Sequence, residues 1–520
     1  MGEAIKYLRG EKKKSYGRIT IYDGFPNNYY EVSSPLLEPK ERELAEMMIA
    51  RLTKQITPTE ALAKLSRIIS TDFTVIFDEK ILNYLETRGL FDHLPSAKET
   101  AYLRNLLKSM LGKFAPFVKN ADGVVNFVID RTIGYHEISE LIRDEQLEEI
   151  MVNGFDRSVY VFHKEYGMCR TNITAEHDGF LEDLLHRIAA TAGKKLTRAS
   201  PYVDARLPDG NRANATLSCI TPFGHSLTIR KFTKIPLSAI DLIGRGTLST
   251  ELAAFLWVAV EGLSIEPLNI LVAGSAGSGK TTTLNCLSNF IAYTDRVITI
   301  EDTAELHLGA RENWVQMESR PKSKDGEEID MDELLRNSLR MRPDRVLVGE
   351  VRGKEAQTLY VAMDIGLSGC MGTLHANNAR ECLIRLKTPP MSVPESMLPL
   401  LNLIVVQDRR YTKDRGLIRR VSHVAELARM EEQVLMSNIY EWDPVRDKIS
   451  RTKTPSRIIE RLAERTNRTK KEVMEEITVR QAILEWMIKK GITSAPEVER
   501  VIQEYYYMPA KIIDLVSRES

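Results

Sequence analysis

The sequence has no apolar run long enough to cross a bilayer. Its longest apolar stretch extends from Leu398 to Val406 and is interrupted by Pro399 and Asn402, whereas a membrane-spanning helix needs about 20 consecutive apolar residues. Cysteine is also scarce, because the 520 residues include five cysteines and no C-x-x-C pair. This pattern indicates neither a disulfide framework nor a zinc site, so we expect a reducing compartment.

The sequence also has no excess of charge of either sign. Lys and Arg together number 72, and so do Asp and Glu. This balance argues against an obligate binder of polyanions, although a local basic patch is compatible with a neutral total. Apolar residues make up 43% and charged residues 28%, which is typical of globular domains. Because the chain is too long for one hydrophobic core, we expect three or four domains in a cytoplasmic protein.

A complete phosphate-binding loop occupies the middle of the chain. Residues Gly274 to Thr281 follow the pattern G-x-x-x-x-G-K-[ST], between an apolar run that predicts a buried strand and a segment that predicts a helix. In such a loop, backbone N–H groups and the helix N-terminus bind phosphate oxygens. Lys280 would lie between the β- and γ-phosphates, and the Thr281 hydroxyl would be a ligand of the bridging Mg²⁺. The predicted nucleotide-binding residues here are Gly274, Ser275, Ala276, Gly277, Ser278, Gly279, Lys280, Thr281 and Thr282.

Carboxylates follow two further predicted strands. Val297–Ile300 is followed by Glu301 and Glu305, and Arg345–Val348 is followed by Glu350. Because parallel strands end at one edge of a sheet, we expect these side chains near the phosphate loop. One carboxylate can orient Mg²⁺ and another can polarise the attacking water. Glu350 occupies the place of a Walker B acid and is predicted to serve Mg²⁺, but the sequence leaves open which of the three glutamates activates water.

Arginines and one histidine accompany these carboxylates. Arg336 and Arg340 are four residues apart and would share one face of a helix. They could instead form ordinary surface ion pairs with nearby carboxylates. Their abundance beside a nucleotide site favours charge neutralisation during phosphoryl transfer. Spacing does not say whether they act within the chain or across a subunit interface. His375 follows a glycine-rich turn and is a candidate catalytic residue, although a single histidine is more often a hydrogen-bonded core residue.

The chain divides into five segments by its patterns. Residues 1–130 predict a helical adaptor or docking region without catalytic residues, and residues 131–232 predict an α+β domain. A linker is expected over residues 233–247. Residues 248–425 alternate strands and helices, which predicts a mostly parallel sheet with helices on both faces. Residues 426–520 predict a mostly helical C-terminal domain.

Together these features resemble the type II/type IV secretion ATPase superfamily, which comprises hexameric motors of secretion, type IV pili and the archaellum. Four segments look like its Walker A, Asp box, Walker B and His box, in that order: Gly274–Thr281, Ile300–Glu305, Val348–Arg352 and Gly372–Asn377. Residues 150–154 and arginines between 206 and 230 look like the family's N-terminal domain. Thr303 and the run Arg342–Arg345 resemble the archaeal branch, and the bacterial four-cysteine zinc insertion is absent.

The resemblance implies an ATP-hydrolysing, Mg²⁺-dependent homohexamer with a RecA-like P-loop domain, peripheral at the cytoplasmic membrane. Glu305 corresponds to the family glutamate proposed to activate water, and Arg336 and Arg340 correspond to arginines that act from a neighbouring subunit. Three arginines look like those that close over the nucleotide: Arg206, Arg212 and Arg230. The implied partners are a polytopic membrane platform protein and, indirectly, pilin-like or secreted substrates. Secretion, pilus assembly and archaellum rotation all stay open.

Two other classes of function compete with this interpretation. A RecA-like nucleic-acid motor predicts a strong basic patch, stacking aromatic residues and a steep salt dependence. The zero net charge and the segment around His375 argue against it, so no nucleic acid is expected as a partner. A small-molecule kinase predicts an acceptor pocket and a lid in a monomer, and no segment suggests a second substrate. The sequence therefore favours ATP hydrolysis that drives secretion or filament assembly.

Overall fold

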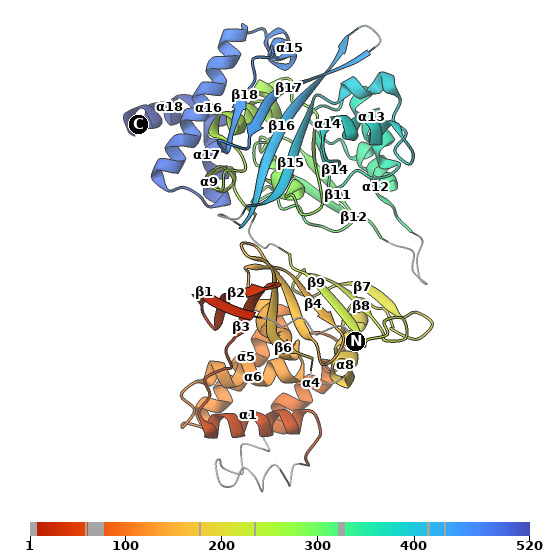
Figure 1. Cartoon of the computed structure of the whole chain (residues 1–520), viewed down its shortest axis with the longest axis vertical. Coiled ribbons are helices and arrows are strands. Elements are labelled where there is room, and N and C mark those ends of the chain that lie inside the picture. Colours follow the sequence, from red (N-terminus) through yellow and green to blue (C-terminus); the bar gives the residue numbers. More distant parts are fainter. Residues whose placement is uncertain are drawn as a thin grey trace. The chain divides into compact units, whose positions relative to one another are not determined.

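The computed structural model describes residues 8–57, 60, 77–175, 178–232, 236–320, 328–412, 416–430 and 433–519. The chain forms two compact units, Met1–Phe232 and Thr233–Ser520 (Figure 1). One predicted boundary falls at this division, whereas the predicted boundaries after residues 130 and 425 fall inside a helix and a strand. Residues 233–235 of the predicted linker and part of the predicted N-terminal region lie outside the described residues.

A sheet of nine described strands frames the first unit. Neighbouring strands are antiparallel, except that β3 and β6 run parallel. In their order across the sheet, the strands are β1 (Leu8–Tyr16), β2 (Ile19–Phe25), β3 (Asn28–Val32), β6 (Gly167–Thr174), β5 (Ser158–His163), β4 (Leu147–Asn153), β9 (Ser226–Arg230), β8 (Arg212–Thr216) and β7 (Tyr202–Arg206). Alternate side chains such as Ile150, Val161 and Ile229 are buried with those of helix α8 (Asp178–Thr191) in one core.

The first three strands differ from the helical region that we expected at the N-terminus. Strand β1 carries Lys12, Lys13 and Lys14 and lacks an apolar alternation, so its sequence does not predict a strand. It pairs with β2, which buries Ile19 and Ile21. The helices that follow the strands bury a separate core. They are α1 (Pro39–Leu52), η1 (Asp78–Leu82), α4 (Asn83–Thr87), α5 (Ala97–Phe114) and α6 (Ala121–Thr132). Two short helices come after them, η2 (His136–Ile138) and α7 (Ser139–Arg143).

The second unit is built on another sheet of nine described strands, of which the first six in the sheet are parallel. In their order across the sheet, they are β12 (Trp314–Glu318), β11 (Val297–Glu301), β13 (Arg345–Val348), β14 (Met371–His375), β10 (Ile270–Gly274), β15 (Leu403–Thr412), β16 (Gly416–Met430), β17 (Gln433–Asp443) and β18 (Lys448–Arg451). The last three, β16 to β18, extend the sheet and are each antiparallel to the strand before. The strands from β10 to β15 therefore form one parallel sheet, as the alternating pattern of residues 248–425 predicts.

Helices cover both faces of this sheet. Along β10, Ile270 and Val272 contribute to the core that contains α10, α11 and the C-terminal helices. Leu271 and Ala273 contribute to the opposite core, which contains α12, α13 and α14. This double burial explains why β10 is apolar without alternation. The helices of this unit are α9 (Ala239–Gly244), α10 (Thr250–Glu261), η3 (Gly262–Ser264), α11 (Lys280–Ser288), α12 (Met331–Ser338), η4 (Leu339–Met341), α13 (Glu355–Asp364), α14 (Ala379–Lys387), η5 (Glu395–Leu400), α15 (Arg457–Arg465), α16 (Lys470–Lys490), α17 (Ala495–Tyr507) and α18 (Pro509–Glu519).

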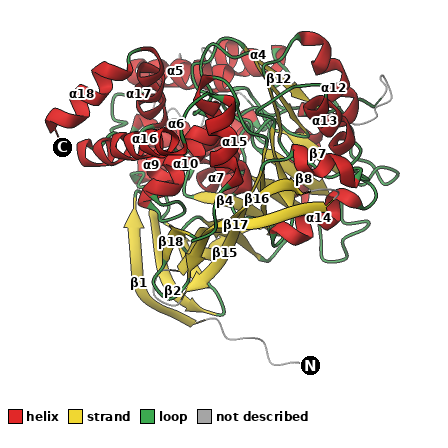
Figure 2. Ribbon diagram, turned by 90° about the horizontal axis from the view of Figure 1, so that it is seen from above, coloured by secondary structure: helices red, strands yellow, loops and turns green. Residues whose placement is uncertain are grey.

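The C-terminal segment is part of the second unit. Strands β17 and β18 precede its helices, and α16 lies alongside α10 (Figure 2). Helix α16 begins with a capping box formed by Thr469 and Glu472 and ends at Gly491, whose φ is +70°. None of the described helices is long and apolar enough to cross a membrane.

A buried ion pair joins α16 to α10. The Arg480 guanidinium donates to Glu261 Oε2 at 2.7 Å and to Glu476 Oε1 at 3.0 Å. The side chains of Arg480 and Glu261 are 3% and 6% exposed. Glu261 also accepts hydrogen bonds from the Leu263 backbone and the Ser264 hydroxyl, which fixes the turn after α10. The pair therefore links the C-terminal helices to the helix that packs beside β10.

We expect Arg480→Ala to lower the free energy of unfolding of the second unit by about 3–5 kcal/mol, because the Glu261 carboxylate would stay buried without its partner. All four tryptophans lie in this unit, so urea unfolding followed by tryptophan fluorescence measures it. The matched control is Arg461→Ala, which removes a more exposed ion pair to Glu266 and should cost less than about 1 kcal/mol. Equal losses in the two variants would contradict the structural role of the buried pair.

Candidate nucleotide site

The predicted loop connects the end of β10 to the start of α11, as the strand–loop–helix pattern requires. Gly277 and Gly279 have φ values of +68° and +96°, a region that side-chain-bearing residues rarely adopt. The Lys280 ammonium donates to the Ser275 carbonyl at 3.0 Å and so lies against the loop. The Ser278 hydroxyl oxygen is buried and has no hydrogen-bond partner. The loop thus contains a buried, unsatisfied polar atom of the kind that a phosphate oxygen can satisfy.

The register of the sheet brings three predicted residues together. Gly274 pairs with His375 on β14, and β14 also neighbours β13, which leads to Glu350. The Lys280 Nζ lies 3.3 Å from His375 Nδ1. His375 Nε2 in turn lies 3.3 Å from Glu350 Oε1. An ammonium, an imidazole and a carboxylate therefore form a continuous polar chain at the edge where the parallel strands end.

This environment favours the neutral form of His375. Partial burial lowers the pKa of its imidazole below the ordinary value, and the positive charge of Lys280 lowers the pKa further. The Glu350 carboxylate acts in the opposite direction. A neutral ring can accept a hydrogen bond from Lys280 and donate one to Glu350. The ring can therefore orient both charged groups.

The glutamates at the ends of β11 and β13 differ in their environments. Glu301 is 1% exposed, and its carboxylate accepts hydrogen bonds from the backbone N–H groups of Glu305 and Leu306 and from the Gln316 side chain. Burial raises the pKa of Glu301, while these hydrogen bonds lower it. Its carboxylate is thus occupied in shaping the loop that carries Glu305. Glu305 and Glu350 are only partly buried.

The arginines before Glu350 separate into two groups. Arg345 is buried and donates to Asp295 at 2.7 Å, so it stabilises the start of β13. Arg336 and Arg340 are exposed; Arg336 pairs with Asp332 at 2.6 Å, and Arg340 lies in η4 beyond the end of α12. Because α12 and η4 lead into β13, Arg340 lies near the edge where the strands begin. The phosphate loop lies at the opposite edge, so the chain does not bring Arg340 to its own loop.

The three predicted arginines of the first unit form a row across neighbouring strands. Arg206 pairs in register with Arg212, and Arg212 pairs with Arg230. All three side chains are exposed, whereas the intervening Ala205, Ala213 and Ile229 are buried on the other face. Three cations aligned in this way make a surface that attracts anions.

Sequence reasoning missed residues that approach the loop from the β15–β16 hairpin. Gly274 pairs with Gln407 on β15, and the Gln407 side chain accepts a hydrogen bond from Thr283 at 2.8 Å. Arg419 on β16 donates to the Gly277 carbonyl at 2.9 Å. A Cβ atom on Gly277 would lie 2.7 Å from Arg409 Nη1, so this guanidinium also lies against the loop. The only sequence signal was the pair of arginines after an apolar strand, which is too common to identify a site.

The donor set fits a nucleotide with Mg²⁺. The described residues contain no group of three or more His, Cys, Asp or Glu side chains that could hold a metal ion. Magnesium commonly uses one or two protein ligands together with substrate phosphates, and Thr281 and Glu350 are the residues that would contribute here. The ion would supply charge neutralisation at the phosphates.

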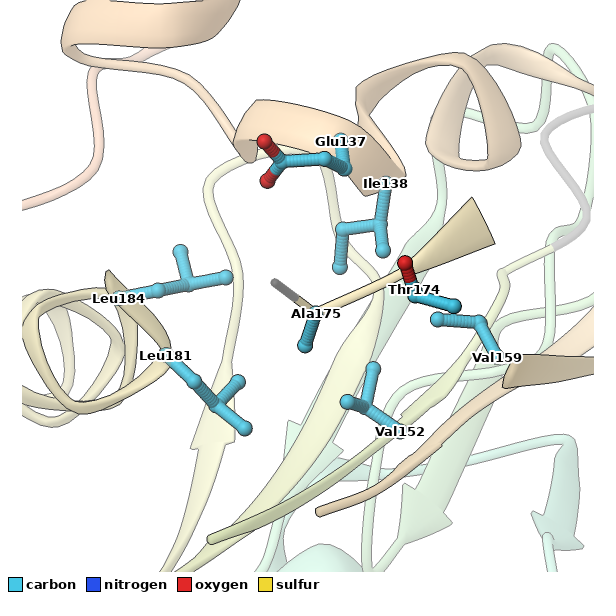
Figure 3. A pocket seen from close by; sticks show the side chains of 8 residues that line it. All are labelled: Glu137, Ile138, Val152, Val159, Thr174, Ala175, Leu181 and Leu184. Carbon is cyan, nitrogen blue, oxygen red and sulfur yellow. The ribbon is translucent and has the colours of Figure 1, made fainter. Parts of the chain in front are cut away.

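A cavity in the first unit is separate from these groups. It has a volume of about 10 Å³ and is lined by apolar side chains such as Val152, Val159, Leu181 and Leu184, with Glu137 at its margin (Figure 3). This volume holds one water molecule at most. The cavity is therefore a packing defect and not a ligand site.

The phosphate loop, the parallel sheet and the polar strand ends define a P-loop protein of the α/β class. The family model described as "Type II/IV secretion system protein" matches residues 133–500. An uncharacterized protein of Methanocaldococcus jannaschii is 31% identical over 488 residues, which cover 92% of this chain and 85% of that relative. Another from the same organism is 46% identical over 260 residues, which cover 49% of this chain but only 35% of that relative. One similar solved structure is that of the VirB11 ATPase from the Brucella suis type IV secretion system in complex with sulphate, which is 25% identical in sequence. The match covers 56% of this chain and 93% of that chain, and its TM-score is 0.28.

The chain belongs to the type II/IV secretion system ATPase family, because the family model covers more than half of it. This confirms the family that the four sequence segments predicted. The two relatives from Methanocaldococcus jannaschii agree with the archaeal branch suggested by Thr303 and Arg342–Arg345. The fold of the chain is correspondingly a multidomain α/β fold with two large sheets.

The neutral state of His375 predicts a specific pH dependence. Because its pKa is lowered below the ordinary value, hydrolysis that needs the neutral ring should decline at a lower pH than an unperturbed histidine would allow, as the pH falls through that lowered pKa. His375→Gln, which stays neutral at every pH, should hydrolyse ATP more slowly but lack this acidic decline. The measurement is kcat/KM against pH for both proteins, with the exposed His186→Gln as control. An identical acidic decline in wild type and His375→Gln would show that another group titrates.

Proposed function

We propose that this protein is an ATP-hydrolysing hexameric motor that powers protein secretion or the assembly of a type IV pilus-like or archaellum filament. The observation that carries this proposal is the polar chain from Lys280 through His375 to Glu350 beside the phosphate loop. It combines a cation for the phosphates with a carboxylate for Mg²⁺ and water. Membership of the secretion ATPase family supplies the link from hydrolysis to transport.

Each group has a distinct role in the proposed hydrolysis. Lys280 binds the β- and γ-phosphates, and the Thr281 hydroxyl contributes a ligand to Mg²⁺. Glu350 serves Mg²⁺ directly or through water. Glu305 polarises the attacking water, because the Glu301 carboxylate is already occupied by three hydrogen bonds. His375 positions Lys280 and Glu350 relative to each other.

The proposed ring explains the arginines that the chain does not bring to its own loop. Arg340 is exposed near the edge where the strands begin, so it would act on the nucleotide of a neighbouring subunit. The row formed by Arg206, Arg212 and Arg230 would close over the nucleotide when the first unit approaches the second. Such closure and reopening would be a rigid-body movement of units driven by binding and hydrolysis.

The proposed motor acts at the cytoplasmic face of a membrane through a partner. None of the described helices could span a bilayer. Membership of the secretion ATPase family supports a polytopic membrane platform protein as the partner. The helical core formed by α1, α5 and α6 contains none of the nucleotide-site residues and is the proposed docking region. Pilin-like or secreted proteins would be moved indirectly.

The hydrolytic roles are tested with three single substitutions. Lys280→Ala should abolish hydrolysis and weaken nucleotide binding, because the phosphates lose their fixed cation. Glu305→Gln should bind ATP normally and hydrolyse it about 10²-fold or more slowly, as expected for loss of a general base. Glu350→Gln should in addition change the Mg²⁺ dependence of the rate. Steady-state hydrolysis and direct nucleotide binding measure these effects. If Glu305→Gln turns over normally while Glu350→Gln is inactive, Glu350 and not Glu305 activates the water.

The ring is tested by mixing two inactive variants. Lys280→Ala lacks a working phosphate loop, and Arg340→Ala lacks the arginine that would act on the neighbouring subunit's nucleotide. In well-studied NTPases, loss of such an arginine lowers the rate about 10³–10⁵-fold. Mixed rings would contain some sites with an intact loop and an intact neighbouring arginine, so part of the activity should return. The specific activity of wild type should also rise with protein concentration. Absence of recovery, together with activity independent of concentration down to the monomer, excludes an arginine supplied by a neighbour.

A further inference from the structure

Arg409 is a basic residue that the mechanism above leaves without a role. It lies on β15, two residues beyond Gln407, and its side chain is exposed. A Cβ on Gly277 would lie 2.7 Å from its Nη1, so the guanidinium lies directly against the phosphate loop. Among the described residues, no carboxylate forms an ion pair with Arg409. Its neighbour Arg410 instead pairs with Asp408 and lies over the Trp442 ring.

A second arginine lies against the same point of the loop. Arg409 is directly opposite Arg419 in the antiparallel pair β15–β16, and like charges in such positions repel each other. The Arg419 Nε donates to the Gly277 carbonyl at 2.9 Å, so it holds the loop in place. Gly277 is thus flanked by two guanidinium groups.

The strand order assigns Arg409 to one side of the loop. Strand β10 lies between β14 and β15, with Gly274 paired to His375 on one side and to Gln407 on the other. The groups proposed for hydrolysis, His375 and Glu350, belong to the β14 side. A nucleoside triphosphate is a chain with the hydrolysed γ-phosphate at one end and the nucleoside at the other. With the γ-phosphate towards β14, the α-phosphate and nucleoside point towards β15 and Arg409.

We propose that Arg409 is a further nucleotide-binding residue that contacts the α-phosphate from the β15–β16 hairpin of the same chain. Arginine suits this role because its planar, permanently charged group can donate two hydrogen bonds to a phosphate. The α-phosphate is present in both ATP and ADP and does not react. Arg409 would therefore strengthen binding of substrate and product equally and leave the chemical step unchanged. This inference rests on the proposed ATPase function.

The test compares Arg409→Ala and Arg409→Lys with wild type by calorimetric titration with ADP and with a non-hydrolysable ATP analogue. Arg409→Ala should weaken both affinities by about the same factor, on the order of tenfold, as expected for loss of a hydrogen bond to a charged group. Arg409→Lys should lose only about threefold or less, because it keeps the charge. For ATP hydrolysis by Arg409→Ala, KM should rise while kcat stays at the wild-type value. Inorganic pyrophosphate, which lacks the α-phosphate ester and the nucleoside, should inhibit both enzymes with the same inhibition constant.

Two controls give the test its specificity. Arg410→Ala removes an adjacent exposed arginine, and this variant should bind nucleotide like wild type. If Arg410→Ala loses as much nucleotide affinity as Arg409→Ala, the effect comes from the total charge of the hairpin and the proposal is overturned. Three further results would overturn the proposal. Arg409→Ala could bind ADP as tightly as wild type, or pyrophosphate inhibition could weaken in Arg409→Ala as much as ADP binding does. Arg409→Lys could also bind nucleotide as weakly as Arg409→Ala. Lys280→Ala separates the two levels of inference. If that variant binds nucleotide normally, the proposed ATPase site itself fails, whereas failure of Arg409 alone leaves the site intact.

Discussion

The pairing register of β10 with its two neighbours is the constraint on which the candidate site depends. Gly274 is opposite His375 on β14 and opposite Gln407 on β15, so both side chains flank the loop that begins at Gly274. Because successive side chains of a strand point to opposite faces, a slip of one residue would turn either side chain away from the loop. A slip would also exchange the side chains of β10 between two packed cores, since Ile270 and Val272 belong to one core and Leu271 and Ala273 to the other.

Buried acidic and amide side chains fix the segments that follow the strands. The Glu301 carboxylate accepts two backbone N–H groups of the loop after β11, Asn285 accepts the N–H of His307, and Glu355 accepts those of Arg352 and Gly353. Leaving such donors unpaired in the interior would cost about 1–3 kcal/mol each. The acidic residues near the sheet edge therefore fall into two kinds. Glu301 and Glu355 are buried and accept backbone N–H groups, while Glu305 and Glu350 are only partly buried.

Local patterns were sufficient for the loop and the parallel strands, because their signals are contained in a few consecutive residues. The predicted strand Arg345–Val348 has these bounds in the structure, and the predicted strand Val297–Ile300 ends one residue later, at Glu301. Arg345 illustrates the limit, since its position among site-like arginines gave no sign of its buried pair with Asp295. Arg409 and Arg419 could not be predicted either, because more than 130 residues separate them from Gly277 and only the sheet register brings them near. The strands at the N-terminus escaped prediction because β1 has three consecutive lysines and no apolar alternation.

Strand β16 connects the phosphate loop with the start of the second unit. Arg419 contacts the loop, and the next residue, Arg420, points to the other face, where it donates to the Arg245 carbonyl and pairs with Asp447. The adjacent Val421 N–H donates to the Thr247 carbonyl. Helix α9, just before Arg245, packs against α10, α11, α16 and α17. The loop and the segment from α9 onwards are therefore parts of one packed body.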